Sequence, residues 1–283
     1  MTDQKLFFSR NVRVGKHKTH YVECGDGDAT VLIHGGGPGN SGELNWRQAI
    51  PALAQHGRII AVDLLGYGRT DKPADVEYSH KTLVDHVAAF LDVLCLEKVN
   101  LCGNSLGAYI AARCAVDEPD RVTKLLLVGS GTIAQAMGLG LQTGIGTKAL
   151  AEFDGTKESL RELIKVLMHH PEYVAETQLE ARFRATLQPG AGEAYRNFMR
   201  TRLRDEPAHT KWFDLSRRLP DLAIPIQFIW GAHDAVAPCS FVQQLKGLLP
   251  GAEFEVFDDS GHLAHNDEPT RFNRAAIRFL FGQ

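Results

Sequence analysis

Short, mostly apolar runs recur along the first part of the chain. They occupy residues 31–33, 59–62, 99–102 and 122–128, are rich in Val, Ile and Leu, and are each followed by a glycine or polar residue. Runs of this length and composition are typical of strands that are buried on both faces, as in a parallel sheet. The pattern therefore predicts four such strands.

Longer segments with helical spacing separate these runs. They lie at 46–55, 81–94 and 106–116, and in the second of them Leu83, Val87 and Phe90 share one face. Strands that alternate with amphipathic helices indicate an open α/β sheet with helices on both faces.

The same alternation returns near the end of the chain. Residues 226–230 and 254–257 read as strands, and residues 241–249 and 270–281 as helices, with Pro269 suited to a first helical turn. At the other end, residues 6–14 and 18–24 indicate an antiparallel hairpin that precedes the sheet.

The pattern changes between the two parts. Residues 132–214 contain no strand-like run, and helical spacing is found at 158–169, 171–186 and 193–204. We expect a helical cap here, inserted between residues 1–131 and 215–283 of one core. The alternative is a long helical crossover that packs directly on that core.

A Gly-x-Ser-x-Gly motif at 103–107 follows a predicted strand and precedes a predicted helix. A nucleophile elbow needs this context, because the tight turn lifts the Ser105 hydroxyl above the sheet edge. The alternative is a purely structural turn. The motif predicts Ser105 as a catalytic nucleophile.

A serine nucleophile needs a base and an orienting acid, which follow this elbow in the order acid, then histidine. Asp234 and His262 each come shortly after a predicted C-terminal strand, so both should reach the sheet edge that carries Ser105. His265 is the nearest rival for the base, and Asp259 could replace Asp234 as the acid.

A glycine-rich turn, His-Gly-Gly-Gly-Pro-Gly at 34–39, directly follows the first predicted sheet strand. Acyl transfer creates an oxyanion that backbone N–H groups can stabilise. We expect Leu106 to supply one N–H and Gly36 or Gly35 the other. A phosphate-binding loop is the alternative, but the spacing matches neither common phosphate motif.

Composition narrows the function classes. The 283 residues are 44% hydrophobic and 23% charged, with 31 basic and 34 acidic side chains, so the basic excess usual for nucleic-acid binding is missing. No apolar run reaches the roughly 20 residues of a membrane span. Five scattered cysteines without a Cys-x-x-Cys pair predict reduced thiols in the cytoplasm and no metal site.

These motifs together resemble the α/β-hydrolase superfamily over nearly the whole chain. The resemblance implies an eight-stranded, mostly parallel sheet with helices on both faces and a helical cap after the sixth strand. Because position 105 is serine, the chain does not look like the members that use a carboxylate nucleophile.

A finer resemblance is to the meta-cleavage product hydrolases, which break a carbon–carbon bond in ring-fission products of aromatic compounds. It rests on the glycine loop followed by Asn45, on Asn104 before the serine, and on Arg182. The resemblance implies that Gly35, Gly37 and these three residues bind the substrate, with Arg182 holding its carboxylate.

Each of these residues has a plainer interpretation. Asn45 could be a helix N-cap, Arg182 a solvated helix charge, and Arg184 a competing arginine. One departure concerns the position after His262, where the family usually has tryptophan and this chain has Leu263, which we expect to help set the substrate.

The resemblance implies hydrolysis of a 2-hydroxy-6-oxo-hexa-2,4-dienoate type of compound, with no cofactor and no metal. A carboxylesterase or lactonase with the same three catalytic residues is the alternative, proline iminopeptidase is a weaker one, and a ligand receptor on the same fold is a third. We expect a small-molecule partner, no nucleic-acid or membrane partner, and, from the frequency of two-fold oligomers, a homodimer.

Overall fold

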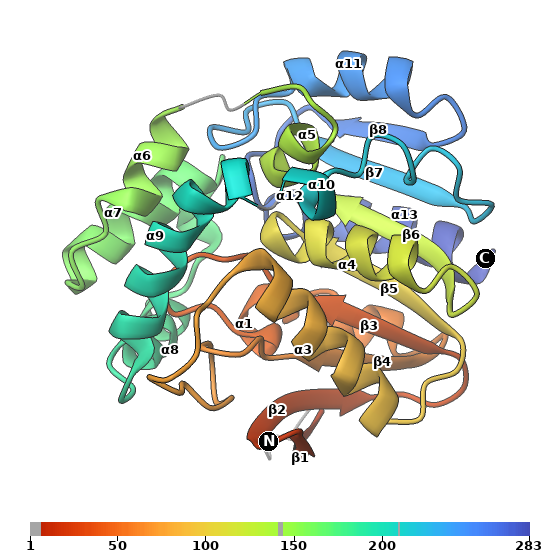
Figure 1. Ribbon diagram of the computed structural model, residues 1–283. Helices are drawn as coiled ribbons and strands as arrows, with labels where there is room; N and C mark the ends of the chain where they lie inside the picture. The colour runs from red at the N-terminus through yellow and green to blue at the C-terminus, as the bar shows by residue number, and fades with distance from the viewer. Residues whose placement is uncertain (1–6, 141–143, 209) are drawn as a thin grey trace.

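A single eight-stranded sheet runs through the molecule (Figure 1). The computed structural model describes residues 7–140, 144–208 and 210–283, so the expected hairpin start at Leu6 lies outside the described residues. The strands are β1 (Phe8–Val14), β2 (His17–Cys24), β3 (Ala29–Ile33), β4 (Arg58–Val62), β5 (Val99–Asn104), β6 (Val122–Val128), β7 (Ile226–Gly231) and β8 (Glu253–Phe257).

The strand order is β1-β2-β4-β3-β5-β6-β7-β8. β2 pairs antiparallel with both β1 and β4, and every other pairing is parallel. The expected N-terminal hairpin and the eight-stranded, mostly parallel sheet are therefore confirmed. Parallel strands bring their carboxyl ends to one edge, which is where open α/β sheets bind their ligands.

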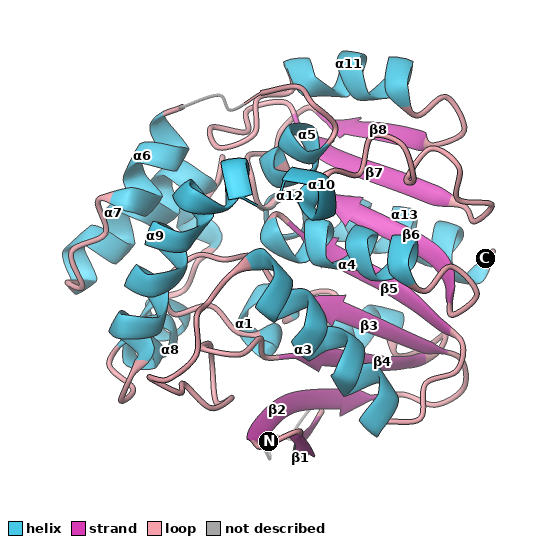
Figure 2. Cartoon of the chain, in the orientation of Figure 1, coloured by secondary structure: helices cyan, strands magenta, loops and turns pink. Residues whose placement is uncertain are grey.

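Helices cover both faces of the sheet (Figure 2). Successive strand residues point to opposite faces, so Val31 and Ile33 pack into one hydrophobic core while Leu32 packs into the other. The first core receives α3 (His80–Val93), α4 (Leu106–Asp117) and α11 (Ser240–Leu248). The second receives α1 (Gly42–Trp46), α2 (Ile50–Leu53), α12 (Ala264–Asp267) and α13 (Pro269–Phe281).

The single helix expected at 46–55 is wrong, because two short helices, α1 and α2, occupy this region. Pro51 lies in the first turn of α2, where its missing N–H costs nothing, whereas in a helix interior its ring would clash with the preceding turn. Residues 47–49 therefore separate α1 from α2.

A helical insertion, defined here as residues 132–214, connects β6 to β7. Its helices are α5 (Gly131–Ala136), α6 (Ile145–Ala151), α7 (Lys157–Leu167), the 3-10 turn η1 (Pro171–Tyr173), α8 (Glu176–Thr186), α9 (Ala191–Ala208) and α10 (Thr210–Phe213). The one helix expected at 171–186 is wrong: Val174 and Ala175 are extended and separate η1 from α8.

Helices α6 to α9 gather beyond the carboxyl ends of the strands (Figure 1). Leu160, Leu163 and Leu179 form a small hydrophobic cluster of their own there, joined by Leu263 from the chain after β8. The insertion after the sixth strand is confirmed as part of the fold. That residues 132–214 form a separate cap on a core made of residues 1–131 and 215–283 stays a prediction.

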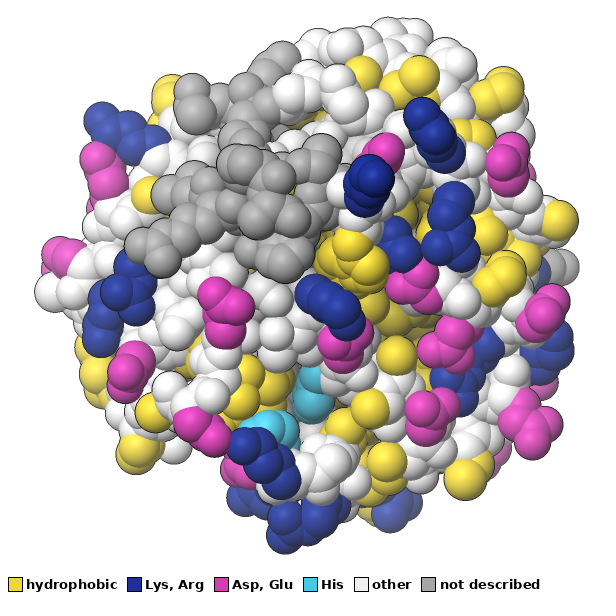
Figure 3. Space-filling model, in the orientation of Figure 1, with side chains coloured by type: hydrophobic (Ala, Val, Ile, Leu, Met, Phe, Trp, Pro, Cys, Tyr) yellow, Lys and Arg dark blue, Asp and Glu magenta, His cyan; other side chains and the backbone are white. Residues whose placement is uncertain are grey.

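The surface carries charges of both signs. On the face shown in Figure 3, lysine and arginine side chains are interspersed with aspartate and glutamate. Among the described residues, no helix combines the length and apolar character that crossing a bilayer requires.

Two glycines set how closely α4 lies against the sheet. A Cβ on Gly107 would lie 2.2 Å from the carbonyl oxygen of Ile33 in β3, and a Cβ on Gly103 would lie 2.2 Å from that of Gly107. Real Cβ atoms do not approach backbone this closely, so the turn between β5 and α4 requires glycine at both positions.

We expect Gly107→Ala to lower the free energy of unfolding by at least about 2 kcal/mol, because α4 must move away from β3. Urea unfolding followed by circular dichroism measures this loss. Gly247→Ala in α11 is the control: a Cβ there meets nothing within 4 Å, and alanine should stabilise the helix by about 0.5–1 kcal/mol. Equal stability of the two variants would contradict the close approach.

Candidate active site

Ser105 occupies the sharp turn between β5 and α4. Its φ of +54° and ψ of −117° place it, with Cys95, among the two non-glycine residues of the described chain that have positive φ. Such a conformation costs about 1–3 kcal/mol and persists only where the surroundings enforce it. Here the N–H of Ser105 donates to the Val128 carbonyl at 2.9 Å, and the Ser130 hydroxyl donates to the Ser105 carbonyl at 2.8 Å.

Asp234 and His262 form a buried pair. The Nδ1 atom of His262 lies 2.8 Å from Oδ2 of Asp234, and their side chains are 4% and 0% exposed. The other carboxylate oxygen of Asp234 accepts the N–H groups of Val236 and Ala237, each at 2.8 Å. The aspartate is thus fixed from behind and can orient the imidazole, as the sequence order predicts.

The two alternatives for these roles fit the structure poorly. Asp259 is 66% exposed and pairs with His169 and His170 instead of with His262. His265 is buried, packs its ring 4.4 Å from that of Trp46, and bonds Asn45. The loop after β8 therefore presents His262, and not His265, to Asp234.

Ser105 and His262 line one cavity. Its floor is formed by the elbow and the glycine-rich turn, and its roof by side chains of the helical insertion, including Leu150, Phe198 and Met199. A concave site that combines apolar walls with polar groups such as these is typical of one that binds a small organic molecule.

The glycine-rich turn packs directly on the elbow. A Cβ on Gly35 would lie 3.3 Å from Cβ of Ser105, and one on Gly36 would lie 2.9 Å from the Leu106 side chain. His34 anchors the turn, because its Nδ1 bonds the Gly35 carbonyl at 2.8 Å and its Nε2 accepts the Leu64 N–H at 3.0 Å. Burial lowers the pKa of His34, consistent with this neutral form.

Asn45 faces a second cavity that adjoins the first. The N-cap interpretation is wrong, because Ser41 caps α1 and Asn45 lies inside the helix. The side-chain oxygen Oδ1 of Asn45 accepts a hydrogen bond from Nδ2 of Asn40 at 3.0 Å, and Nδ2 of Asn45 lies 3.1 Å from Nε2 of His265.

Asn40 was missed by sequence reasoning although it belongs to the same loop. It is 4% exposed, lines both cavities and also donates to the Gly35 carbonyl at 3.0 Å. Its only sequence signal is its place just after the turn at 34–39. It couples the carbonyl of Gly35 to the amide of Asn45.

Arg182 extends from α8 between the two cavities and lines both. Its Nε donates to the Pro38 carbonyl at 3.0 Å, and a Cβ on Gly37 would lie 2.7 Å from its Nη2. Burial lowers the pKa of Arg182 to about 10. Arg184 is exposed and bonds Glu180, so it does not compete for this position. Arg182 itself is not a solvated helix charge, because it lines both cavities.

Asn104 and Leu263 complete the walls of the first cavity. The Asn104 amide nitrogen donates to the Val128 carbonyl at 3.3 Å and to that of His262 at 3.4 Å. The Oδ1 atom of Asn104 is buried and has no hydrogen-bond partner in the part of the chain that the structure describes. Leu263 is 6% exposed and lines both cavities.

Asp267 joins the helical insertion to the loop that carries His262. One carboxylate oxygen accepts the N–H groups of Gly261 at 2.8 Å and His169 at 3.1 Å, and the other accepts that of His170 at 2.9 Å. The N–H of His262 in turn donates to the Leu167 carbonyl at 2.8 Å. Sequence reasoning did not identify this buried residue.

Comparison with known proteins agrees with this geometry. Residues 29–269 match the model of the family described as alpha/beta hydrolase fold. The chain belongs to the α/β-hydrolase family. It is therefore an enzyme, and the resemblance on which the sequence analysis rested is confirmed.

This α/β-hydrolase has relatives that are meta-cleavage product hydrolases. It is 29% identical to the 2-hydroxy-6-oxo-2,4-heptadienoate hydrolase of Pseudomonas putida, over 99% of each chain. It is 32% identical to a 2-hydroxy-6-oxononadienedioate/2-hydroxy-6-oxononatrienedioate hydrolase of Burkholderia vietnamiensis, over 93% of this chain and 91% of that one. The solved meta-cleavage product hydrolase of Pseudomonas fluorescens IP01 is 29% identical, with a TM-score of 0.83 over 96% of this chain and 97% of that one.

The stability of this α/β-hydrolase should fall in acid through His265. Burial lowers its pKa to about 3 in the folded protein, whereas the unfolded chain takes up the proton below about pH 6.5. The free energy of unfolding therefore does not depend on His265 above about pH 6.5. Between about pH 6.5 and about pH 3 it falls by about 1.4 kcal/mol for each unit by which the pH is lowered.

Urea unfolding at about pH 7 and about pH 5 measures this loss. In His265→Gln the loss between the two pH values should be about 2 kcal/mol smaller than in the parent. Equal losses in the two proteins would contradict a neutral buried His265.

Proposed function

We propose that this α/β-hydrolase cleaves a carbon–carbon bond in a 2-hydroxy-6-oxo-hexa-2,4-dienoate type of ring-fission product of aromatic catabolism. The observation that carries the proposal is that Ser105 and His262, the hydrogen-bond partner of Asp234, line one cavity together with the Arg182 guanidinium. A nucleophile and a carboxylate anchor in one enclosed space suit a substrate that carries both a ketone and a carboxylate.

Arg182 supports the carboxylate end of this substrate. A guanidinium binds a carboxylate through paired, charge-assisted hydrogen bonds, which gain strength where water is partly excluded. Burial already disfavours the Arg182 charge, as its lowered pKa indicates, so an anion that neutralises it should bind favourably. Asn40 and Asn45 offer amide groups beside it for the 2-oxygen of the substrate. Gly35 and Gly37 line the first cavity and have no side chains, which leaves room for this end.

The reaction would begin with conversion of the bound dienol to its keto tautomer. The 2-hydroxyl proton leaves, a proton is delivered to C5, and the charge that develops near the carboxylate is stabilised by Arg182 and the asparagines. His262, held by Asp234, is the group that can move these protons inside the cavity.

Ser105, or a water that it positions, then attacks the C6 ketone, and His262 takes the proton of the attacking group. The N–H groups of Gly36 and Leu106 would hold the oxyanion. The C5–C6 bond then breaks, and its electron pair returns to the dienoate, which regains the 2-hydroxyl proton. Water supplies the second oxygen of the new carboxyl group at C6, either directly or by hydrolysing the ester formed with Ser105. The products are a 2-hydroxydienoate and a carboxylic acid.

One difference from the meta-cleavage product hydrolases favours an esterase or lactonase activity. Leu263 stands where the meta-cleavage product hydrolases usually have tryptophan, so the wall beside His262 is smaller and more apolar here. The same three catalytic residues would hydrolyse an ester by ordinary acyl transfer.

We also propose that the enzyme is cytoplasmic. Cys102 and Cys114 are buried, and burial raises the pKa of both thiols. Reduced thiols of this kind suit a cytoplasmic enzyme. We also propose a homodimer, from the general frequency of two-fold assemblies.

The deciding experiment mixes the enzyme with a coloured ring-fission dienoate and follows the loss of its absorbance. Rapid loss, with one equivalent each of hydroxydienoate and carboxylic acid, is expected. Ester hydrolysis with no loss of the dienoate colour would reject carbon–carbon cleavage, and tight dienoate binding without either reaction would indicate a receptor.

Variants of His262, Asp234 and Asp259 test which residues act as the base and the acid, in the same assay. His262→Ala and Asp234→Asn should each reduce kcat by about 10⁴-fold, because the base is lost or left misoriented. Asp259→Asn is the matched control and should retain parental turnover. Substantial turnover in His262→Ala, or a loss confined to Asp259→Asn, would contradict the assignment.

Arg182→Ala should lower kcat/KM for carboxylate substrates by about 10–100-fold, because a charge-assisted pair is worth about 1.5–3 kcal/mol. Steady-state kinetics on the dienoate gives this ratio. Arg184→Ala, on the exposed side of the same helix, should change it little. An unchanged kcat/KM in Arg182→Ala would remove this arginine from the substrate site.

A further inference from the structure

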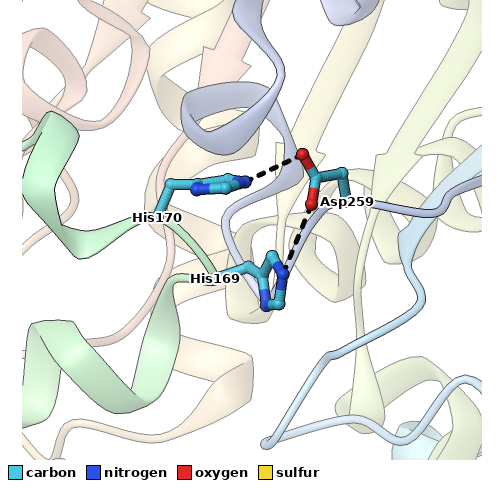
Figure 4. A group of neighbouring side chains, drawn as sticks. All are labelled: His169, His170 and Asp259. Atoms are coloured by element: carbon cyan, nitrogen blue, oxygen red, sulfur yellow. Dashed lines mark ion pairs between the residues drawn. The ribbon is translucent and has the colours of Figure 1, made fainter.

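Three side chains with metal-binding atoms converge outside the cavity that holds Ser105. His169 and His170 follow α7 in the helical insertion, and Asp259 lies in the loop after β8 (Figure 4). The Nε2 atom of His169 lies 3.3 Å from one carboxylate oxygen of Asp259, and Nε2 of His170 lies 2.9 Å from the other.

The donor set suits a transition metal. Two imidazoles and one carboxylate are common ligands of Zn²⁺, at bond lengths of about 2.0–2.2 Å and with a fourth position for water. A tetrahedral ion with such bonds has ligand atoms about 3.4 Å apart. The candidate ligand atoms here all lie within 4.8 Å of one another, so small rotations of these solvent-reachable side chains would enclose an ion.

The backbone beneath the two histidines is fixed before any ion arrives. The buried Asp267 carboxylate accepts the N–H groups of both His169 and His170, and also that of Gly261, two residues beyond Asp259. Residues from the insertion and from the loop after β8 are therefore held in one arrangement. Side chains whose backbone is already fixed lose less conformational entropy when they bind a metal ion.

The imidazole rings are oriented as well. Nδ1 of His170 lies 3.0 Å from a Glu172 carboxylate oxygen, which leaves Nε2 to face Asp259. Among the described residues, no hydrogen bond of good geometry reaches that Nε2. A carboxylate behind a ligating histidine is the usual outer partner in zinc sites. The ring of His169 stacks on His233, with centroids 4.1 Å apart and planes 9° apart.

We propose that His169, His170 and Asp259 bind a divalent transition-metal ion of the zinc class. The ion would connect the helical insertion to the loop that reaches His262 three residues after Asp259. The exposed fractions of the three side chains, 35%, 21% and 66%, leave this site open to solvent. The site is separate from the carbon–carbon cleavage chemistry and does not rest on it.

Calorimetric titration of tag-free, chelator-treated enzyme with ZnCl₂ tests the proposal, at a pH above the ordinary pKa of histidine. One equivalent of Zn²⁺ should bind and raise Tm. His170→Gln and Asp259→Asn should each weaken binding by at least about tenfold, as loss of a ligand requires. Asp259→Glu, which keeps the carboxylate, should restore most of the affinity.

Two further variants show where the ion binds. His56→Gln, which removes a surface histidine elsewhere, and His262→Ala should both bind Zn²⁺ as the parent does. Co²⁺ in place of Zn²⁺ should give the intense visible absorption of a four-coordinate site. The proposal is overturned if the parent binds no Zn²⁺, if binding survives unchanged in both ligand variants, or if it is lost in His262→Ala. Circular dichroism and metal-free turnover of the ligand variants should match the parent.

Discussion

The close approach of α4 to β3 is the constraint on which the site depends. It requires glycine on both sides of Ser105, because the backbone of one element lies where a side chain of the other would have to be. Ser105 lies between these glycines with a positive φ, and hydrogen bonds to Val128 and Ser130 hold its backbone. The strain at one residue is therefore balanced by packing that extends over β5, α4 and the neighbouring strand.

The position of the glycine-rich turn depends on the close approach of α4 to β3. Gly35 and Gly36 lie against Ser105 and Leu106, so the two backbone segments proposed to hold an oxyanion are adjacent because they pack on one another. Asn40 and His34 then bind the turn from behind through the Gly35 carbonyl. Rigid polar groups of this kind need no rearrangement when charge develops in a reaction.

Much of the fold could be predicted because its signals are local. The strands ending near His34, Gly103 and Gly129 are short apolar runs, and the elbow is defined by five adjacent residues. The break before α2 was missed although Pro51 signals it, since helical spacing on both sides concealed the turn.

The rest of the site depends on contacts between residues far apart in the sequence. Asp267 bonds His169 across 98 positions, and Arg182 bonds Pro38 across 144. No pattern within one segment encodes such pairs, because they exist only once the insertion has packed over the sheet edge. The resemblance supplied Arg182, whereas Asn40 and Asp267 had no comparable signal.

Leu263 has a consequence for how this enzyme can change. It adjoins His262 in sequence, forms part of both cavity walls, and also belongs to the hydrophobic cluster of Leu160, Leu163 and Leu179. A larger or smaller side chain there alters the space for the substrate and the packing of the insertion in one step. Evolution or engineering of substrate preference at this position is therefore tied to compensating changes in those leucines.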